Sequence, residues 1–354
     1  MRLALKLDVD TYRGTREGVP RLMRLLAQHR AGATFLFSLG PDHTGRAVRR
    51  VFRRGFVGKV ARTSVLEHYG IRTLLYGTLL PGPDIGARCA PILRTAREAG
   101  FETGIHCWDH VRWQDGVARA GADWTRAEMR RAFERYAAVF GEPARVHGAA
   151  GWQMNPHAFA VERELGAEYA SDTRGRGPFV PLLAAGAEGV PQLPTTLPTL
   201  DELIGIDGAT PDDALARVLE LSREAPAQGH VYTLHAELEG GRLAPQFERL
   251  LEGWRALGYE LGNWRLELEG SGSHSKFVGN YEGGVIWTGA SVNLLYDFHL
   301  APHWKAYVGG GLGGGDLNRE AYSPLSDAGQ FAQWGLQWQA IGGLSFGLSP
   351  NFDL

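Results

Sequence analysis

Between residues 1 and about 268, short apolar runs alternate with longer amphipathic segments. Residues 2–7 (RLALKL) and 32–40 (GATFLFSLG) have the length of buried strands, whereas residues 15–29 (TREGVPRLMRLLAQH) repeat apolar residues at a period near 3.6, which is typical of a helix. Repeated strand–helix units favour a parallel sheet covered by helices. The chain is therefore predicted to form an α/β fold of the barrel or barrel-like kind, with its chemistry at the C-terminal ends of the strands.

The same alternation continues through the rest of this region. We expect further strands at 101–108, 145–152, 167–172 and 229–237, and helices at 89–100, 123–141, 155–166, 210–225 and 243–258. Together these elements define one α/β domain, residues 1–268.

The character of the sequence changes at Gly270. The run GSGS at 270–273 is typical of a flexible linker, which we place at 269–275. Beyond it the helical periodicity ends, and glycine and aromatic residues dominate residues 276–354. We expect strands at 285–298, 303–314 and 338–349, and so an appended all-β segment.

Composition excludes several classes of protein. A net charge of −2 argues against a general nucleic-acid binder. Two cysteines, Cys89 and Cys107, cannot make a disulfide framework and fit a reducing compartment. The first ten residues, MRLALKLDVD, are interrupted by acids and do not predict a signal peptide. No run of about 18 apolar residues occurs, so no transmembrane helix is expected.

Two acids and two histidines stand at predicted strand ends. Asp8 and Asp10 share one face at the end of the first strand, where two carboxylates would repel each other. His106 and His110 are four residues apart, so both imidazoles can point at one spot. Two imidazoles and a carboxylate suit Zn²⁺ or another borderline divalent ion. With Asp10 on the ion and Asp8 facing its open position, the positive charge makes the acid pair tolerable.

Each of these signals has a simpler interpretation. The acid pair could be a helix cap or a solvated turn. His110 could be a surface residue, and Cys107 is either a third soft ligand or a small packed thiol. His235, at the end of a late strand, could be a general acid or a core histidine. Asp172, at an earlier strand end, could orient that imidazole or cap a helix.

The order of these motifs resembles that of the polysaccharide deacetylase (NodB-type) superfamily. The shared pattern is an acid pair after the first strand, HxxxH after a middle strand, a glycine-containing strand-end loop and a late LxH. From residue 3 to about 265 the chain more closely resembles the superfamily's deformylases of 4-deoxy-4-formamido-L-arabinose-phosphoundecaprenol. The motifs that carry this likeness are DVDTYRGTREGVPRL, GPDHTGR, HCWDH, AAGWQ, SDTRG, LPTTLPTLDELIG and YTLHAELEG. The fold that this implies is a distorted (β/α) barrel of the NodB type.

The resemblance implies a role for each candidate residue. Asp10, His106 and His110 become the ligands of a divalent metal, with Zn²⁺ expected first and Mn²⁺, Co²⁺ or Ni²⁺ as alternatives. Asp8 becomes the general base, and His235 the general acid that Asp172 supports. The backbone N–H groups near Gly151 and Trp152 become candidate oxyanion donors.

The chain departs from the family pattern at Gln153, where the deformylases carry an arginine. Another residue must then fix the charge of Asp8 or grip the substrate phosphate. The alternatives are Arg13, Arg16 and Arg174, each of which could equally be a surface arginine.

The resemblance also implies an activity and a place. The reaction would release formate from an undecaprenyl-phosphate-linked formamido sugar, leaving a 4-amino sugar on its lipid. This is a step in lipid A modification and in resistance to polymyxin and other cationic antimicrobial peptides. The enzyme would be peripheral on the cytoplasmic face of the bacterial inner membrane, and no nucleic acid or protein partner is predicted.

A basic segment at residues 45–70 fits a membrane-bound substrate. Arg49, Arg50, Arg53 and Arg54 alternate there with apolar residues, so the segment could lie on an anionic membrane surface. Its simpler interpretation is a solvated helix face.

Two rival functions stay open from the sequence. A sugar N-deacetylase of the same superfamily differs by one methyl group in its substrate. Residues 276–354 resemble a fragment of an outer-membrane β-barrel protein, which would suit a membrane structural protein with an inactive α/β passenger.

Overall fold

The computed structural model describes residues 1–47, 65–261, 263–276, 282–301, 304–323, 326–349 and 352–353. The chain divides into two compact units, Met1–Leu261 and Gly262–Leu354.

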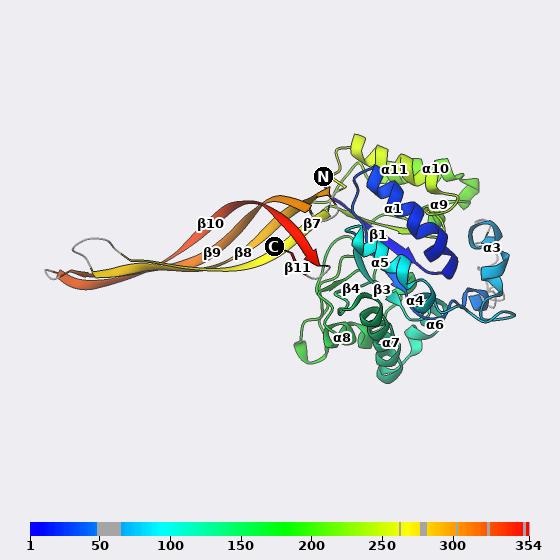
Figure 1. Cartoon of the computed structure of the whole chain (residues 1–354), viewed down its shortest axis with the longest axis horizontal. Helices are drawn as coiled ribbons and strands as arrows, with labels where there is room; N and C mark the ends of the chain where they lie inside the picture. Colours follow the sequence, from blue (N-terminus) through cyan, green and yellow to red (C-terminus); the bar gives the residue numbers. More distant parts are fainter. Residues whose placement is uncertain are drawn as a thin grey trace. The chain divides into compact units, whose positions relative to one another are not determined.

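The first unit is built on a six-stranded parallel sheet (Figure 1). Its strand order is β5-β4-β3-β2-β1-β6, so the last strand of the unit pairs with the first. The strands are β1 (Leu3–Val9), β2 (Thr34–Ser38), β3 (Glu102–Cys107), β4 (Val146–His147), β5 (Tyr169–Ala170) and β6 (His230–His235). Parallel strands with helical crossovers confirm the predicted α/β fold of the distorted (β/α) barrel kind.

Helices connect these strands and cover the sheet. The segments predicted as helices overlap α1 (Val19–Gln28), α5 (Ala90–Glu98), α7 (Ala122–Phe140), α8 (Pro156–Glu164), α10 (Pro211–Leu221) and α11 (Ala244–Ala256). The sequence did not predict a π-helical turn before α1, η1 (Gly14–Gly18), or the helices α3 (Val65–Leu75), α4 (Ile85–Arg88), α6 (His110–Gly116) and α9 (Leu200–Leu203). The described part of the unit also has short 3₁₀ turns, among them η3 (Val117–Arg119), η4 (Ala150–Trp152), η5 (Ala184–Gly186) and η6 (Ile206–Gly208).

Strand β1 is buried on both faces, and its two faces differ in chemistry. Leu3, Leu5, Leu7 and Val9 point into the hydrophobic core. The alternate positions Lys6, Asp8 and Asp10 are also buried, with 3%, 3% and 8% of their surfaces exposed. Because successive residues of a strand alternate between faces, this period of two aligns three charged side chains along the opposite face of the strand.

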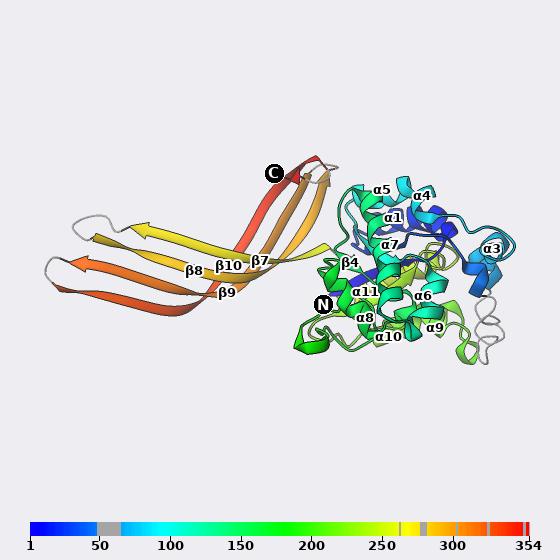
Figure 2. The ribbon, with the colours of Figure 1, turned by 90° about the horizontal axis from the view of Figure 1, so that it is seen from below.

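The second unit is an antiparallel sheet with strand order β11-β10-β9-β8-β7. Its long strands run side by side as a twisted ribbon (Figure 2). The strands are β7 (Asn263–Lys276), β8 (Glu282–Ala301), β9 (Trp304–Ser323), β10 (Ser326–Ser349) and β11 (Phe352–Asp353). The all-β character expected of this segment is confirmed.

The expected linker at 269–275 is corrected by the structure, because these residues lie within β7. Ser271 and Ser273 pair with Gly289 and Trp287 of β8. Strand pairing therefore outweighs the low intrinsic strand preference of glycine and serine. Within the ranges that the structure describes, no helix has the length and apolar character needed to cross a membrane.

Candidate active site

Asp10, His106 and His110 converge at the C-terminal edge of the parallel sheet. The Oδ1 of Asp10 lies 3.2 Å from Nε2 of His106, and its Oδ2 lies 3.4 Å from Nε2 of His110. One potential ligand atom from each residue lies within 4.8 Å of the others. Asp10 follows β1, His106 is in β3 and His110 begins α6, so the parallel sheet brings together residues far apart in the sequence.

A hydrogen bond orients the His106 ring toward Asp10. Its Nδ1 lies 2.7 Å from the carbonyl oxygen of Gly148. Because a carbonyl only accepts, Nδ1 carries the proton and Nε2 presents its lone pair toward Asp10. This is the tautomer that a metal-ligating histidine needs.

The three residues fit a divalent cation in the chemistry of their ligand atoms and in an oxygen atom that lacks a hydrogen-bond partner. Within the described part of the chain, the buried Oδ1 of Asp10 has no hydrogen-bond partner. Burial acts to raise the pKa of Asp10, but the imidazoles of His110 and His106 outweigh it and lower the pKa below its ordinary value. Two imidazoles and an ionised carboxylate are a ligand set for Zn²⁺ and similar ions.

Asp8 finds its partner on its own strand. The Nζ of Lys6 lies 3.3 Å from Oδ2 of Asp8, and both side chains are buried. Lys6 thus compensates the charge of Asp8, a role that the sequence analysis gave to arginines. Of these, Arg13 pairs with Glu17 and Arg174 with Glu202. The lysine was missed although it stands two residues before Asp8, on the same face of β1.

The third arginine, Arg16, packs against the ring of Tyr12. Its guanidinium carbon is 5.5 Å from the centre of the Tyr12 ring.

His235 ends β6 directly beside Asp8 in the strand register. Burial acts to lower the pKa of His235, but the surrounding carboxylates, Asp201 first, outweigh it and raise the pKa to about 9. The Nδ1 of His235 lies 3.9 Å from Oδ1 of Asp201. His235 is therefore an imidazole with a raised pKa and with Asp201 as its acidic neighbour.

The expectation that Asp172 supports His235 is wrong. Oδ1 of Asp172 lies 2.8 Å from Nδ1 of His147 and accepts a 2.7 Å hydrogen bond from the N–H of Ala149. The physical reason is strand order: Asp172 follows β5 at one end of the sheet, whereas His235 ends β6 at the other. That order is not visible in the sequence.

Asp172 belongs to a second buried cluster with His147 and Glu162. Glu162 Oε1 lies 2.8 Å from Nδ1 of His147, and Gln192 donates a hydrogen bond to the other carboxylate oxygen of Glu162. Burial acts to lower the pKa of His147, but Asp172 and Glu162 outweigh it and raise the pKa to about 10. For Asp172, burial is outweighed by His147, and its pKa falls to about 2.

The loop after β4 is only partly available to a substrate. Gly151 and Trp152 have φ values of 62° and 54°, in the left-handed region. The N–H of Trp152 already donates to the carbonyl of Ala149 at 3.1 Å, so it is not a spare oxyanion donor. The N–H of Gly151 stays a prediction. The Trp152 ring packs against Arg174, whose guanidinium carbon is 4.8 Å from the ring centre.

Two acids that the sequence analysis missed fix the loops around the site. Oε1 of Glu237 accepts hydrogen bonds from the N–H of Asp10 and from the N–H and hydroxyl of Thr11. Glu239 accepts a 2.8 Å bond from the N–H of His235. The acids at alternate positions in LHAELEG were the available signal. Glu237 thus ties the turn after β1 to the turn after β6, and Glu239 fixes the end of β6 to the turn that follows it.

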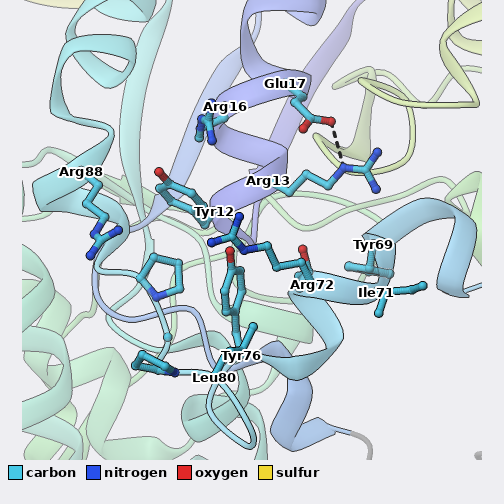
Figure 3. Close-up of a pocket in the computed structure, with 15 residues that line it drawn as sticks. Tyr12, Arg13, Arg16, Glu17, Tyr69, Ile71, Arg72, Tyr76, Leu80 and Arg88 are labelled. Atoms are coloured by element: carbon cyan, nitrogen blue, oxygen red, sulfur yellow. Dashed lines mark hydrogen bonds and ion pairs between the residues drawn. The ribbon is translucent and has the colours of Figure 1, made fainter.

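A pocket of about 650 Å³ opens beside this edge of the sheet (Figure 3). Tyr12, two residues after Asp10, forms part of its wall. The other lining residues are Arg13, Arg16, Glu17, Tyr69, Gly70, Ile71, Arg72, Thr73, Tyr76, Leu80, Pro81, Gly82, Pro83 and Arg88.

Two other expectations have different outcomes. Cys107 is buried, with its Sγ 3.2 Å from the hydroxyl of Ser38, and it does not join the metal-ligand group, which favours the packed thiol. Arg49, Arg50, Arg53 and Arg54 lie outside the described residues, so their contact with a membrane stays a prediction.

Comparison with known proteins shows what the chain is similar to. No family model matches the chain. The chain is 38% identical over 250 residues to a protein of Shewanella sediminis (strain HAW-EB3) described as "Probable 4-deoxy-4-formamido-L-arabinose-phosphoundecaprenol deformylase ArnD". The match covers 71% of this chain and 80% of that protein. A protein of Wigglesworthia glossinidia brevipalpis with the same description is 31% identical over 239 residues, covering 67% of this chain and 82% of that protein.

A solved structure supports the fold. The "putative polysaccharide deacetylase from Mycobacterium smegmatis" aligns with a TM-score of 0.50 at 19% identity. The alignment covers 73% of this chain and 86% of that one.

Proposed function

The chain belongs to the 4-deoxy-4-formamido-L-arabinose-phosphoundecaprenol deformylase (ArnD) family, and on this premise we propose that it hydrolyses the formamide of that lipid-linked sugar. The products are formate and 4-amino-4-deoxy-L-arabinose-phosphoundecaprenol, the amino sugar used in lipid A modification. The observation that carries the proposal is the convergence of Asp8 with Asp10, His106 and His110 at one edge of the sheet.

Asp10, His106 and His110 would hold a divalent ion, for which Zn²⁺ is our first choice and Mn²⁺, Co²⁺ and Ni²⁺ are alternatives. When bound, such an ion acts as a Lewis acid toward an amide carbonyl and makes water more acidic.

Asp8 is suited to act as the general base. Its Oδ1 is buried and has no hydrogen-bond partner among the residues that the structure describes, so it can accept a proton from the attacking water. Lys6 lies 3.3 Å from the other carboxylate oxygen and leaves Oδ1 as the atom that is available to the substrate water.

His235 is suited to act as the general acid. An amine leaves an amide carbon only when its nitrogen is protonated, so the leaving group needs a donor. With Nδ1 turned toward Asp201, Nε2 is the atom from which His235 would donate. A pKa of about 9 keeps the imidazole protonated near neutral pH.

The test is to supply purified full-length protein with the formamido sugar phosphodiester and with its acetamido analogue. We expect formate from the first and much slower acetate release from the second. The acetamido group carries one more methyl group, and a pocket that fits the smaller group typically lowers kcat/KM for the larger one by about 10–200-fold. Acetate release that equals formate release would instead favour the sugar N-deacetylase. Asp8→Asn is the matched inactive control.

A lipid-linked substrate also implies work at a membrane surface. We place the enzyme as a peripheral protein on the cytoplasmic face of the inner membrane, with Arg49, Arg50, Arg53 and Arg54 contacting anionic lipid. Replacing these four residues by serine should weaken sedimentation with anionic liposomes and spare turnover of a soluble analogue. Unchanged sedimentation would contradict this placement.

A further inference from the structure

We propose that the pocket lined by Arg13, Arg16, Arg72 and Arg88 is an anion subsite that binds the phosphodiester of the lipid-linked substrate. This inference rests on the proposed function and adds to it the part of the chain that recognises the substrate's charge. The ligand chemistry is a singly charged phosphodiester on a sugar.

The pocket is strongly cationic. It contains four guanidinium groups and one carboxylate, a net charge of +3. The carboxylate, that of Glu17, pairs with Arg13 at 2.9 Å. Arg16, Arg72 and Arg88 have no carboxylate within 4 Å in the part of the chain that the structure describes. Cations gathered in a concave site without acids to balance them favour an anionic ligand.

The arginines reach the pocket from separate elements (Figure 3). Arg13 and Arg16 belong to the turn that follows β1, Arg72 to α3 and Arg88 to the last turn of α4. Because three elements that are distant in the sequence present guanidinium groups to one cavity, the arrangement is not a solvated stripe along one helix. Planar guanidinium groups match the paired oxygens of a phosphodiester.

The backbone is shaped to admit one of these side chains. Gly70 has a φ of 75°, inside a helix that it interrupts. A Cβ at this position would lie 2.7 Å from Nη1 of Arg13. The positive φ favours glycine at this position, and the absence of a side chain leaves room for the flexible end of Arg13 in the position that it takes here.

The pocket adjoins the metal-ligand group. Tyr12 is two residues from Asp10 and lines the pocket, and its N–H donates a 2.9 Å hydrogen bond to Asp42. Tyr69 lines the same pocket. Burial and then the nearby carboxylate of Asp10 raise its pKa well above the ordinary value, which places its ring within the field of the site. A sugar whose formamide lies near Asp10 would therefore have this cavity beside it for its phosphate.

The test compares two substrates of the full-length protein. One is the formamido sugar on a short-prenyl phosphodiester, and the other is a neutral alkyl glycoside of the same formamido sugar. The quantity measured is the ratio of kcat/KM for the charged substrate to kcat/KM for the neutral one. Arg72→Gln and Arg88→Gln should each lower this ratio by about tenfold or more, since a hydrogen bond to a charged group typically contributes that much. Arg217→Gln, on the exposed face of α10, is the matched control and should leave the ratio unchanged.

Two further arms separate the sources of the phosphate. Inorganic phosphate should inhibit the wild type more strongly than it inhibits Arg72→Gln. Sedimentation with phosphatidylglycerol vesicles should be equal for both proteins, because the subsite recognises the substrate and not the bilayer. If the variants lost vesicle binding with no change in the ratio, the ligand would be a lipid headgroup and the proposal would be overturned.

The outcomes distinguish a failure of the anion subsite from a failure of the proposed deformylase function. If the wild type releases no formate from either substrate, the proposed function fails and the subsite fails with it. If the wild type releases formate and the ratio is unchanged in both arginine variants, only the subsite is overturned.

Discussion

Two clusters of histidine and carboxylate lie in the same α/β unit, yet they differ in their exposure to solvent and in their hydrogen bonds. Asp10, His106 and His110 form one, and His147, Glu162 and Asp172 form the other. In the first, His110 is partly exposed and Oδ1 of Asp10 lacks a hydrogen-bond partner among the described residues. In the second, all three side chains are sealed from solvent, and Ala149 and Gln192 donate to Asp172 and Glu162, although Oδ2 of Asp172 also lacks a hydrogen-bond partner among the described residues.

The comparison shows that ligand type alone does not identify a metal centre. In the sealed cluster the histidine serves as the cation, with a raised pKa, and Asp172 is its counter-charge, whereas burial and then the charge of Asp172 raise the pKa of Glu162 well above its ordinary value. In the open cluster the histidine orientation, set by the carbonyl of Gly148, turns a lone pair toward the carboxylate. Access to solvent and the orientation of the imidazole, and not an unpartnered carboxylate oxygen alone, distinguish the candidate ion site from the sealed ion pair.

The largest expected effect comes from removing one acid from each cluster and measuring formate release. Asp10→Asn should lower kcat/KM by on the order of 10³-fold or more, since even a single charge-stabilising donor accounts for about 10²–10³-fold. Asp172→Asn should retain much more activity, measured at a temperature where the variant is folded. Equal losses in the two variants would erase the distinction between the clusters.

For the free energy of unfolding, in contrast to activity, we expect a large effect of Asp172→Asn. Asp172→Asn leaves the buried imidazolium of His147 without one counter-charge, and we expect a loss of about 3–5 kcal/mol in the free energy of unfolding. Asp212→Asn removes an acid from an exposed pair with Arg249 and should cost at most about 1 kcal/mol. Denaturant unfolding of the three proteins measures the difference.

The difference in unfolding free energy between the wild type and Asp172→Asn should depend on pH. The pKa of His147 is about 10 in the folded protein and about 6.5 when unfolded. Its protonation therefore stabilises the fold fully below pH 6.5, and this contribution is lost as the pH rises toward 10. The stability gap between wild type and Asp172→Asn should narrow over that window, and a constant gap would contradict a charged His147.

A smaller effect is expected at His235. Asp201→Asn removes the carboxylate that contributes most to raising the pKa of His235, so that pKa should fall. The alkaline limb of the kcat profile should move to lower pH, and kcat at pH 8 should fall about tenfold, less than the about 10²–10⁴-fold that general acid catalysis contributes as a whole, because His235 itself is retained. Asp207→Asn, an exposed acid near Asp201, should leave the profile unchanged. If neither variant moves the limb, His235 is not the proton donor.

The smallest effect should come from the second unit. We assign the activity to the α/β unit, and ending the chain at Leu261 should leave kcat/KM for a soluble substrate unchanged. Loss of formate release by a folded, truncated protein would show that the antiparallel sheet takes part in catalysis.

Much of the fold was readable because its signals are local. Every predicted strand of the α/β unit overlaps one of its six strands, since apolar runs and amphipathic periodicity depend only on neighbours in the chain. Helices of four residues, α4 and α9, are too short to show a helical period. The prediction of a linker at residues 269–275 is wrong because pairing with β8, and not glycine content, decides the backbone conformation there.

The candidate site was predictable to the extent that spacing encodes it. The HxxxH pair and the acids two residues apart fix one face each, so Asp8, Asp10, His106 and His110 could be named together. Asp172 was misplaced because strand order decides which strand ends meet. The alternation that relates Asp8 to Asp10 also extends back to Lys6, a signal that was present and overlooked.

Metal content tests the central claim most directly. Full-length wild type, Asp10→Ala and Asp172→Asn would be purified alike, and bound divalent metal measured per chain by elemental analysis. We expect about one tightly held ion in the wild type and in Asp172→Asn, and its loss in Asp10→Ala. An ion that survives in Asp10→Ala and disappears in Asp172→Asn would show that the sealed cluster is the metal centre and that our assignment is wrong.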